Sequence, residues 1–137
     1  MILVDTSVWI DHLRAGDAAL VRLLETGRVL VHPYVIGELA LGSLKNRELV
    51  ISTLGDLPRV TVATHEEVQR FVGEQTLFGC GIGYVDVHLL AATRLTPGAA
   101  LWTRDTRLAA TAARLSLAAN ILHQAVRWPA IRGISGL

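Results

Sequence analysis

Four carboxylates occupy positions in this sequence where a charged side chain could do chemistry. Asp5 and Asp105 each follow an apolar run, Glu38 interrupts an apolar helical face, and Asp86 lies in the first turn of an expected helix. If they converge, two charges about 5 Å apart repel by roughly 3 kcal/mol at an effective dielectric of about 20. Protons or a cation must then compensate. Oxygen-only donors select Mg²⁺ or Mn²⁺, and such an ion suits phosphoryl chemistry by activating water.

The start of the chain shows how one of these acids is positioned. Ile2–Val4 is a short apolar run with β-branched members, which predicts a strand buried on both faces. Asp5 follows at once, and Ser7 is expected to cap a helix over residues 8–13. Open α/β sheets build their sites at the carboxyl ends of strands. A plain turn or capping role for Asp5 is the alternative, as a stabilising first-turn charge is for Asp86.

Strands and helices alternate along the rest of the sequence. The patterns predict strands at 2–4, 29–31, 60–62, 99–103 and 115–119, with helices at 8–13, 17–25, 33–42, 46–54, 65–78, 84–95 and 106–114. We therefore expect a single α/β domain over residues 1–137, with a mainly parallel sheet of four to five strands flanked by helices. Residues after about 120 are expected to form a loosely held tail. The glycines at 79–83 do not follow a predicted strand, so a phosphate-binding loop is rejected.

Composition narrows the class of protein. Apolar residues make up 51% and charged residues 18%, but uncharged stretches reach only about a dozen residues, below the about 20 that span a membrane. No signal peptide is recognisable, and the single cysteine, Cys80, excludes an intrachain disulfide. These features indicate a cytoplasmic protein. The apolar excess predicts a homodimer or another protein interface. The net charge of +1 neither requires nor excludes nucleic acid.

The ordered set of motifs resembles the PIN-domain family, and within it the VapC-type toxins of bacterial type II toxin–antitoxin systems. The resemblance extends to about residue 120 and rests on Ile2–Ser7, on Glu38 within 35–39, on Asp86 within 84–92, and on Thr103–Asp105. It implies a Mg²⁺- or Mn²⁺-dependent endoribonuclease, usually dimeric and neutralised by a small antitoxin protein.

The resemblance also implies roles for individual residues. Asp5, Glu38, Asp86 and Asp105 would hold the metal as catalytic residues, with Ser7 and Thr103 as hydroxyls that support the carboxylates. Metal-activated water would attack an RNA phosphodiester in line and leave a 5′-phosphate and a 3′-hydroxyl. Arg104 and Arg107 flank Asp105 and are candidates for phosphate contacts, with solvated arginines as the alternative.

Other classes of protein fit less well. A receiver domain needs an acidic pair before its aspartate and a lysine late in the chain, whereas Lys45 is the only lysine. A haloacid-dehalogenase-like phosphatase needs an aspartate where Ser7 stands. A metal-free ribonuclease needs paired histidines, and the five histidines are scattered, at His12, His32, His65, His88 and His123. The remaining alternative is a non-catalytic RNA- or protein-binding PIN-like module, which metal-dependent turnover of RNA would distinguish from the enzyme.

Overall fold

A three-stranded parallel sheet lies at the centre of the computed structural model, which describes residues 1–121. Strand β1 (Ile2–Val4) lies between β2 (Val29–Leu30) and β3 (Ala100–Trp102), so the strand order is β2-β1-β3. The residues of β1 are at most 1% exposed, as expected for a strand that is covered on both faces. The predicted α/β class and parallel sheet are confirmed.

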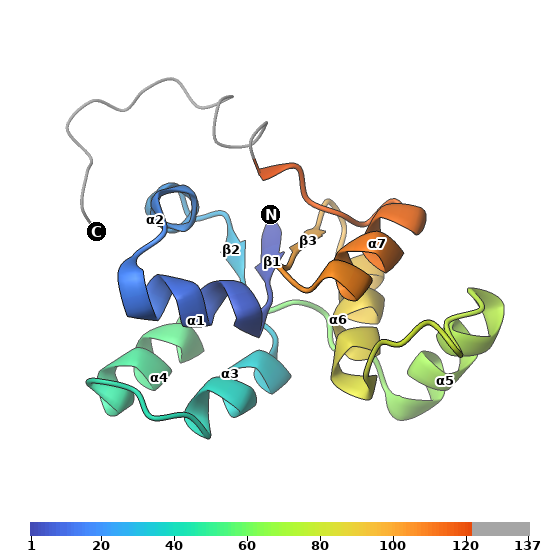
Figure 1. The fold of residues 1–137 in the computed structure, drawn as a ribbon, viewed down its shortest axis with the longest axis horizontal. Coiled ribbons are helices and arrows are strands. Elements are labelled where there is room, and N and C mark those ends of the chain that lie inside the picture. The colour runs from blue at the N-terminus through green and yellow to red at the C-terminus, as the bar shows by residue number, and fades with distance from the viewer. Residues whose placement is uncertain (122–137) are drawn as a thin grey trace.

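Seven helices surround this sheet within the described residues. They are α1 (Thr6–Ala15), α2 (Ala18–Glu25), α3 (Pro33–Ala40), α4 (Arg47–Gly55), α5 (His65–Glu74), α6 (Tyr84–Leu95) and α7 (Thr106–Arg114). Figure 1 shows α1 to α4 on one side of the view and α5 to α7 on the other, with the strands between them. Strand β1 is followed by α1, and β3 is followed by α7. The candidate site lies where these two helices begin.

The sheet has fewer strands than the predicted four to five. Residues 60–62 form no strand, and the chain makes only an isolated parallel bridge just before them, between Val31 and Arg59. Val60 N–H still donates to the carbonyl of Val31, at 3.1 Å. The next N–H, that of Thr61, donates to the side-chain hydroxyl of Thr96 at 2.9 Å. The pairing stops after one step because the next donor on the β2 side would be residue 33, and Pro33 has no N–H and begins α3.

The expected last strand, at 115–119, is likewise reduced to one bridge, between Leu101 and Ala118. The N–H groups of Leu115 and Leu117 donate to carbonyls at the end of α7, and Ser116 has a positive φ of 60°. The first residues of this segment therefore form the C-terminal cap of α7 and are not available for a longer strand.

The helix boundaries agree with the predictions to within two residues, except at the end of α5. Helix α1 begins at Thr6 with Asp5 at its N-cap, so Ser7 is not the cap. Helix α5 ends at Glu74 and not near residue 78, since the chain turns through a positive φ of 54° at Thr76. Thr64 caps α5, with its hydroxyl accepting from Glu67 N–H at 3.1 Å.

None of the helices in residues 1–121 combines the length and the apolar character that crossing a membrane requires. The predicted tail after about residue 120, together with His123, lies outside the residues that the structure describes.

Candidate active site

Asp5 is a carboxylate buried at the carboxyl end of β1. Its side chain is in a residue only 6% exposed, and one oxygen, Oδ2, accepts two hydroxyl hydrogen bonds. Ser7 Oγ donates at 2.8 Å and Thr103 Oγ1 donates at 2.7 Å. Ser7 Oγ also accepts from the N–H of Arg104, at 3.0 Å. The two hydroxyls expected to support the site therefore converge on one carboxylate oxygen and fix its position.

Glu38 approaches from α3 and is not the buried acid that its apolar neighbours indicated. The residue is exposed, so its charge is solvated. Its Oε1 accepts a hydrogen bond of 2.8 Å from Thr6 Oγ1, at the start of α1. Sequence reasoning missed Thr6, although its place directly after Asp5 was the available signal. This bond links the first turn of α1 to the carboxylate on α3.

Asp86 is the acid whose pKa is affected by the other three carboxylates. Its Oδ2 accepts from Gly83 N–H at 3.2 Å, in the first turn of α6. Burial is the main reason that the pKa of Asp86 is raised, while the Gly83 hydrogen bond opposes the rise. The negative charges of Asp5, Asp105 and Glu38 raise this pKa further. The other three acids selected from the sequence therefore lie close enough to Asp86 for their charges to affect its carboxylate.

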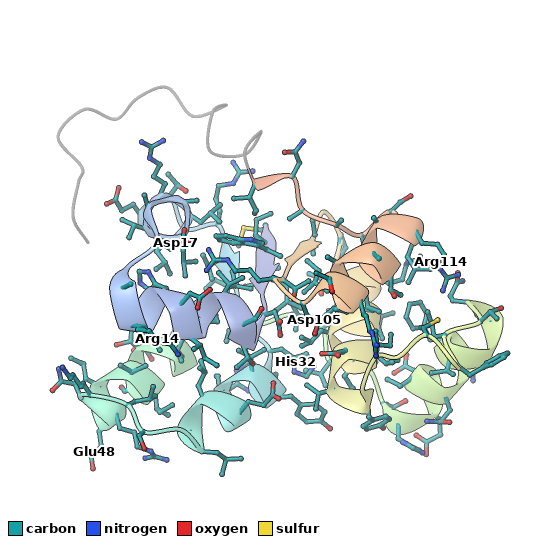
Figure 2. The ribbon with its side chains drawn as sticks, in the orientation of Figure 1. Arg14, Asp17, His32, Glu48, Asp105 and Arg114 are labelled. Carbon is teal, nitrogen blue, oxygen red and sulfur yellow. The ribbon has the colours of Figure 1, made fainter. Side chains whose placement is uncertain are left out.

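Asp105 is the N-cap of α7. Its Oδ1 accepts from Leu108 N–H at 2.9 Å, and its own N–H donates to Thr103 Oγ1 at 3.1 Å. Figure 2 shows Asp105 between the α1–α4 group and the α5–α7 group, with His32 labelled nearby in the same view. The cap fixes the direction of the carboxylate without using both of its oxygens.

The four carboxylates share one hydrogen-bonding pattern. Each uses one oxygen to accept from Ser, Thr or a backbone N–H, and within residues 1–121 the other oxygen has no hydrogen-bond partner; the oxygens in use are Asp5 Oδ2, Glu38 Oε1, Asp86 Oδ2 and Asp105 Oδ1. Four such oxygens are the donor chemistry that Mg²⁺ and Mn²⁺ prefer. The site thus combines fixed carboxylates with unused, negatively charged donors.

The donor set fits a hydrated ion better than a fully enclosed one. In the described part of the chain, no three side chains of His, Cys, Asp or Glu are placed so that they could hold one metal ion as they stand. Mg²⁺ commonly keeps several waters and binds through one or two carboxylates. The unused oxygens therefore suit such an ion without a complete protein cage.

The two arginines beside Asp105 lie in different environments. The Arg104 guanidinium forms ion pairs with Asp11, at 2.5 Å, and with Asp17, and lies 5.7 Å from the centroid of the Trp102 ring. Hydrogen bonds to Asp11 and Asp17 raise the pKa of Arg104 above its ordinary value. Arg107 lies against the 79–83 loop, where a β-carbon added at Gly81 would come within 2.7 Å of Arg107 Nη1. Of the two, Arg107 is the one without a carboxylate partner among residues 1–121.

Comparison with known proteins places these features in a family. The PIN domain profile matches residues 2–114. Two relatives, each described as Ribonuclease VapC32 and from the Mycobacterium tuberculosis strains CDC 1551 / Oshkosh and ATCC 25618 / H37Rv, are 54% identical to this chain over 118 residues. The alignment covers 86% of this chain and 95% of each relative. The resemblance drawn from the motifs is confirmed: the chain belongs to the PIN-domain family.

Proposed function

We propose that this chain is a Mg²⁺- or Mn²⁺-dependent endoribonuclease and acts as the toxin of a toxin–antitoxin pair. The observation that carries the proposal is the group of four carboxylates, each with one oxygen fixed and one unused. Its members lie close enough for three of them to raise the pKa of the fourth, Asp86. The 54% identity to proteins described as Ribonuclease VapC32 supports ribonuclease activity.

Asp5, Glu38, Asp86 and Asp105 are the residues that would hold the ion. When bound, a divalent ion supplies an acidified water for attack on phosphorus and positive charge for the phosphate oxygens. The chain supplies the orientation. Ser7 and Thr103 hold Asp5 through Oδ2, which leaves Oδ1 unused by these hydroxyls. The cap at the start of α7 does the same for Asp105.

Arg107 is the basic residue that we assign to the RNA phosphates. Its side chain packs against the 79–83 loop, and α7 begins at the neighbouring Thr106, directly after Asp105. A guanidinium placed there offsets part of the repulsion between the acids and an RNA phosphate. Arg104 is held by Asp11 and Asp17, so we assign it to tying the end of β3 to α1 and to the start of α2.

Exposed apolar side chains support a protein interface. Leu41 is 91% exposed and Leu49 is 67% exposed, on either side of the α3–α4 connection. Large apolar side chains exposed to this extent are candidates for contact with a partner. We propose a cytoplasmic homodimer that also binds a small antitoxin. Light scattering tests the dimer, because a mass near 14.8 kDa at all concentrations would contradict it. Co-purification with the product of a neighbouring small gene tests the antitoxin.

Cleavage of RNA with and without metal tests the activity. We expect the purified protein to cut RNA in Mg²⁺ or Mn²⁺, to stop in EDTA, and to leave 5′-phosphate ends. The ion should also raise the melting temperature, since binding to the folded state alone stabilises by about 2.7 kcal/mol at a hundredfold excess over Kd. For an aspartate-to-asparagine change in the site, Asp56→Asn is the matched control, because Asp56 is an exposed acid at the end of α4.

Two results would contradict the proposal. Cleavage that survives EDTA, or that leaves 2′,3′-cyclic phosphates, would indicate a metal-free mechanism. RNA binding without any turnover in either ion would indicate a non-catalytic binding module.

A further inference from the structure

A cluster of five rings, here called the aromatic cluster, lies beside the proposed metal site. Its members are His32, Tyr34, His65, Tyr84 and His88. The ring of His88 lies at the centre, 4.8 Å from that of Tyr34 and 4.6 Å from that of Tyr84 between centroids. None of the five side chains has a role in the metal chemistry proposed above.

The chain places the two tyrosines next to two of the four carboxylates. Tyr34 is one turn before Glu38 in α3, so the two side chains lie on the same face of that helix. Tyr84 is the first residue of α6, directly after Gly83, whose N–H holds the carboxylate of Asp86. Tyr84 and Asp86 are two residues apart and project from different sides of α6. The aromatic cluster therefore borders the proposed site through Tyr34, which shares a helix face with Glu38.

Burial separates the cluster into a base and a surface. His32 and His88 are 0% and 2% exposed, whereas Tyr34 and Tyr84 are 40% and 46% exposed. The edge contacts to His88, at interplanar angles of 64° and 83°, support both tyrosine rings from below. The hydroxyl of Tyr84 is also fixed, at 2.6 Å from His65 Nδ1. Two half-exposed rings are thus held in position by a buried support.

Hydrogen bonding does not account for the position of His88. Within residues 1–121, neither of its ring nitrogens has a hydrogen-bond partner, although both are buried. A buried polar group without a partner costs roughly 1–3 kcal/mol. Ring packing against the two tyrosines therefore holds His88 in position. Fixed aromatic rings of this kind lose little entropy when a flat ligand stacks on them.

Charge and shape identify the ligand class. The neighbouring carboxylates repel phosphates, so uncharged base contacts are a means of holding RNA there. A ring can stack on a base only when that base is free of its neighbours, as in a single strand or loop. We propose that Tyr34 and Tyr84 form a stacking subsite for the unpaired bases that flank the cleaved phosphate. This inference rests on the proposed ribonuclease function and assigns the two tyrosine rings to the bases beside the scissile bond.

The experiment compares binding of RNA with and without bases. The probes are a short fluorescein-labelled oligoadenylate and an abasic ribose-phosphate chain of the same length, in Ca²⁺, with fluorescence anisotropy as the readout. Replacement of one stacked ring costs about 1–3 kcal/mol. Tyr34→Leu and Tyr84→Leu should therefore each weaken oligoadenylate binding about tenfold and leave abasic binding unchanged. A double-stranded RNA of the same length should bind without this sensitivity.

Conservative variants keep the test independent of folding. Tyr34→Phe retains the ring and should bind oligoadenylate like the unsubstituted protein, as should Val62→Ala, a change at an exposed residue outside the cluster. Equal binding of oligoadenylate and the abasic chain by the unsubstituted protein would overturn the inference. Leucine variants that bind oligoadenylate normally would overturn it as well, and loss of a co-purifying protein in those variants would assign this surface to a protein.

The two proposals fail in different ways. Metal-dependent cleavage with an unchanged KM in the leucine variants would refute the stacking subsite alone. A base-dependent loss of binding in these variants, in a protein that never cuts RNA, would refute the enzyme and retain the subsite.

Discussion

Acidification should destabilise this protein through His32, the N-cap of α3. The ring is fully buried, and its Nδ1 accepts from Tyr34 N–H at 2.9 Å. Nε2 has no hydrogen-bond partner among residues 1–121. A second proton would convert the accepting Nδ1 into a donor that faces another donor, and would bury a charge. Burial lowers the pKa of His32 to about 4, with the charge of His88 as the smaller cause.

The size of the effect follows from the difference between two pKa values. In the unfolded chain the pKa of His32 is at its ordinary value of 6.5. Between pH 6.5 and pH of about 4, the unfolded chain binds a proton that the folded chain does not, so the free energy of unfolding falls as pH falls. His32 costs nothing above that window and nothing further below it. At about 1.4 kcal/mol per pH unit, the total loss is about 3 kcal/mol.

Urea unfolding in EDTA, from neutral pH to pH of about 4, measures this loss against His32→Asn. Asn retains an oxygen that can cap α3 but does not titrate. The variant loses ring packing and should be less stable at neutral pH, so the slope is the quantity compared. The two curves should approach each other by about 3 kcal/mol as pH falls, with equal m-values. Parallel curves would refute this account of His32.

Three further predictions concern the site. Asp86→Asn should abolish RNA cleavage and raise metal-free stability at neutral pH, because it removes a half-buried charge that lies near three like charges; retained cleavage would refute the assignment. Thr103→Val should lower the free energy of unfolding by about 2 kcal/mol and slow cleavage, since it deletes a hydroxyl bonded to a buried carboxylate, whereas Thr103→Ser should do neither. Gly81→Ala should weaken RNA binding as Arg107→Ala does. Gly79 also has a positive φ, but no atom lies within 4 Å of a β-carbon placed there. Both alanine variants should therefore lose stability in urea unfolding, whereas Gly79→Ala should bind RNA normally.

Local patterns were sufficient to predict most of the helices and the buried first strand. Thr64 caps α5 and Asp105 caps α7 because their side chains suit that position wherever a helix begins. The fourth and fifth strands could not be decided in this way. Their extent depends on pairing between segments that are distant in the sequence, such as the single bridge between Val31 and Arg59.

The site was predictable in its residue types and not in its contacts. Arg104 beside Asp105 indicated phosphate binding, yet its guanidinium is bound by two acids that lie 93 and 87 residues away in the sequence. The aromatic cluster was missed because the histidines were judged as possible catalytic pairs. Tyr84 and His88 are one helical turn apart, and this spacing was the signal that indicates a shared ring surface.

The register of the sheet connects the fold to the chemistry. Val4 of β1 pairs with Trp102 of β3, and Asp5 N–H continues the ladder by donating to the carbonyl of Trp102 at 2.9 Å. This step places the carboxylate of Asp5 within 2.7 Å of the hydroxyl of Thr103. A shift of one residue would turn each side chain of β1 to the opposite face. Any change that weakens β1 pairing should therefore reduce activity before it unfolds the protein, because the site depends on register while the core depends only on burial.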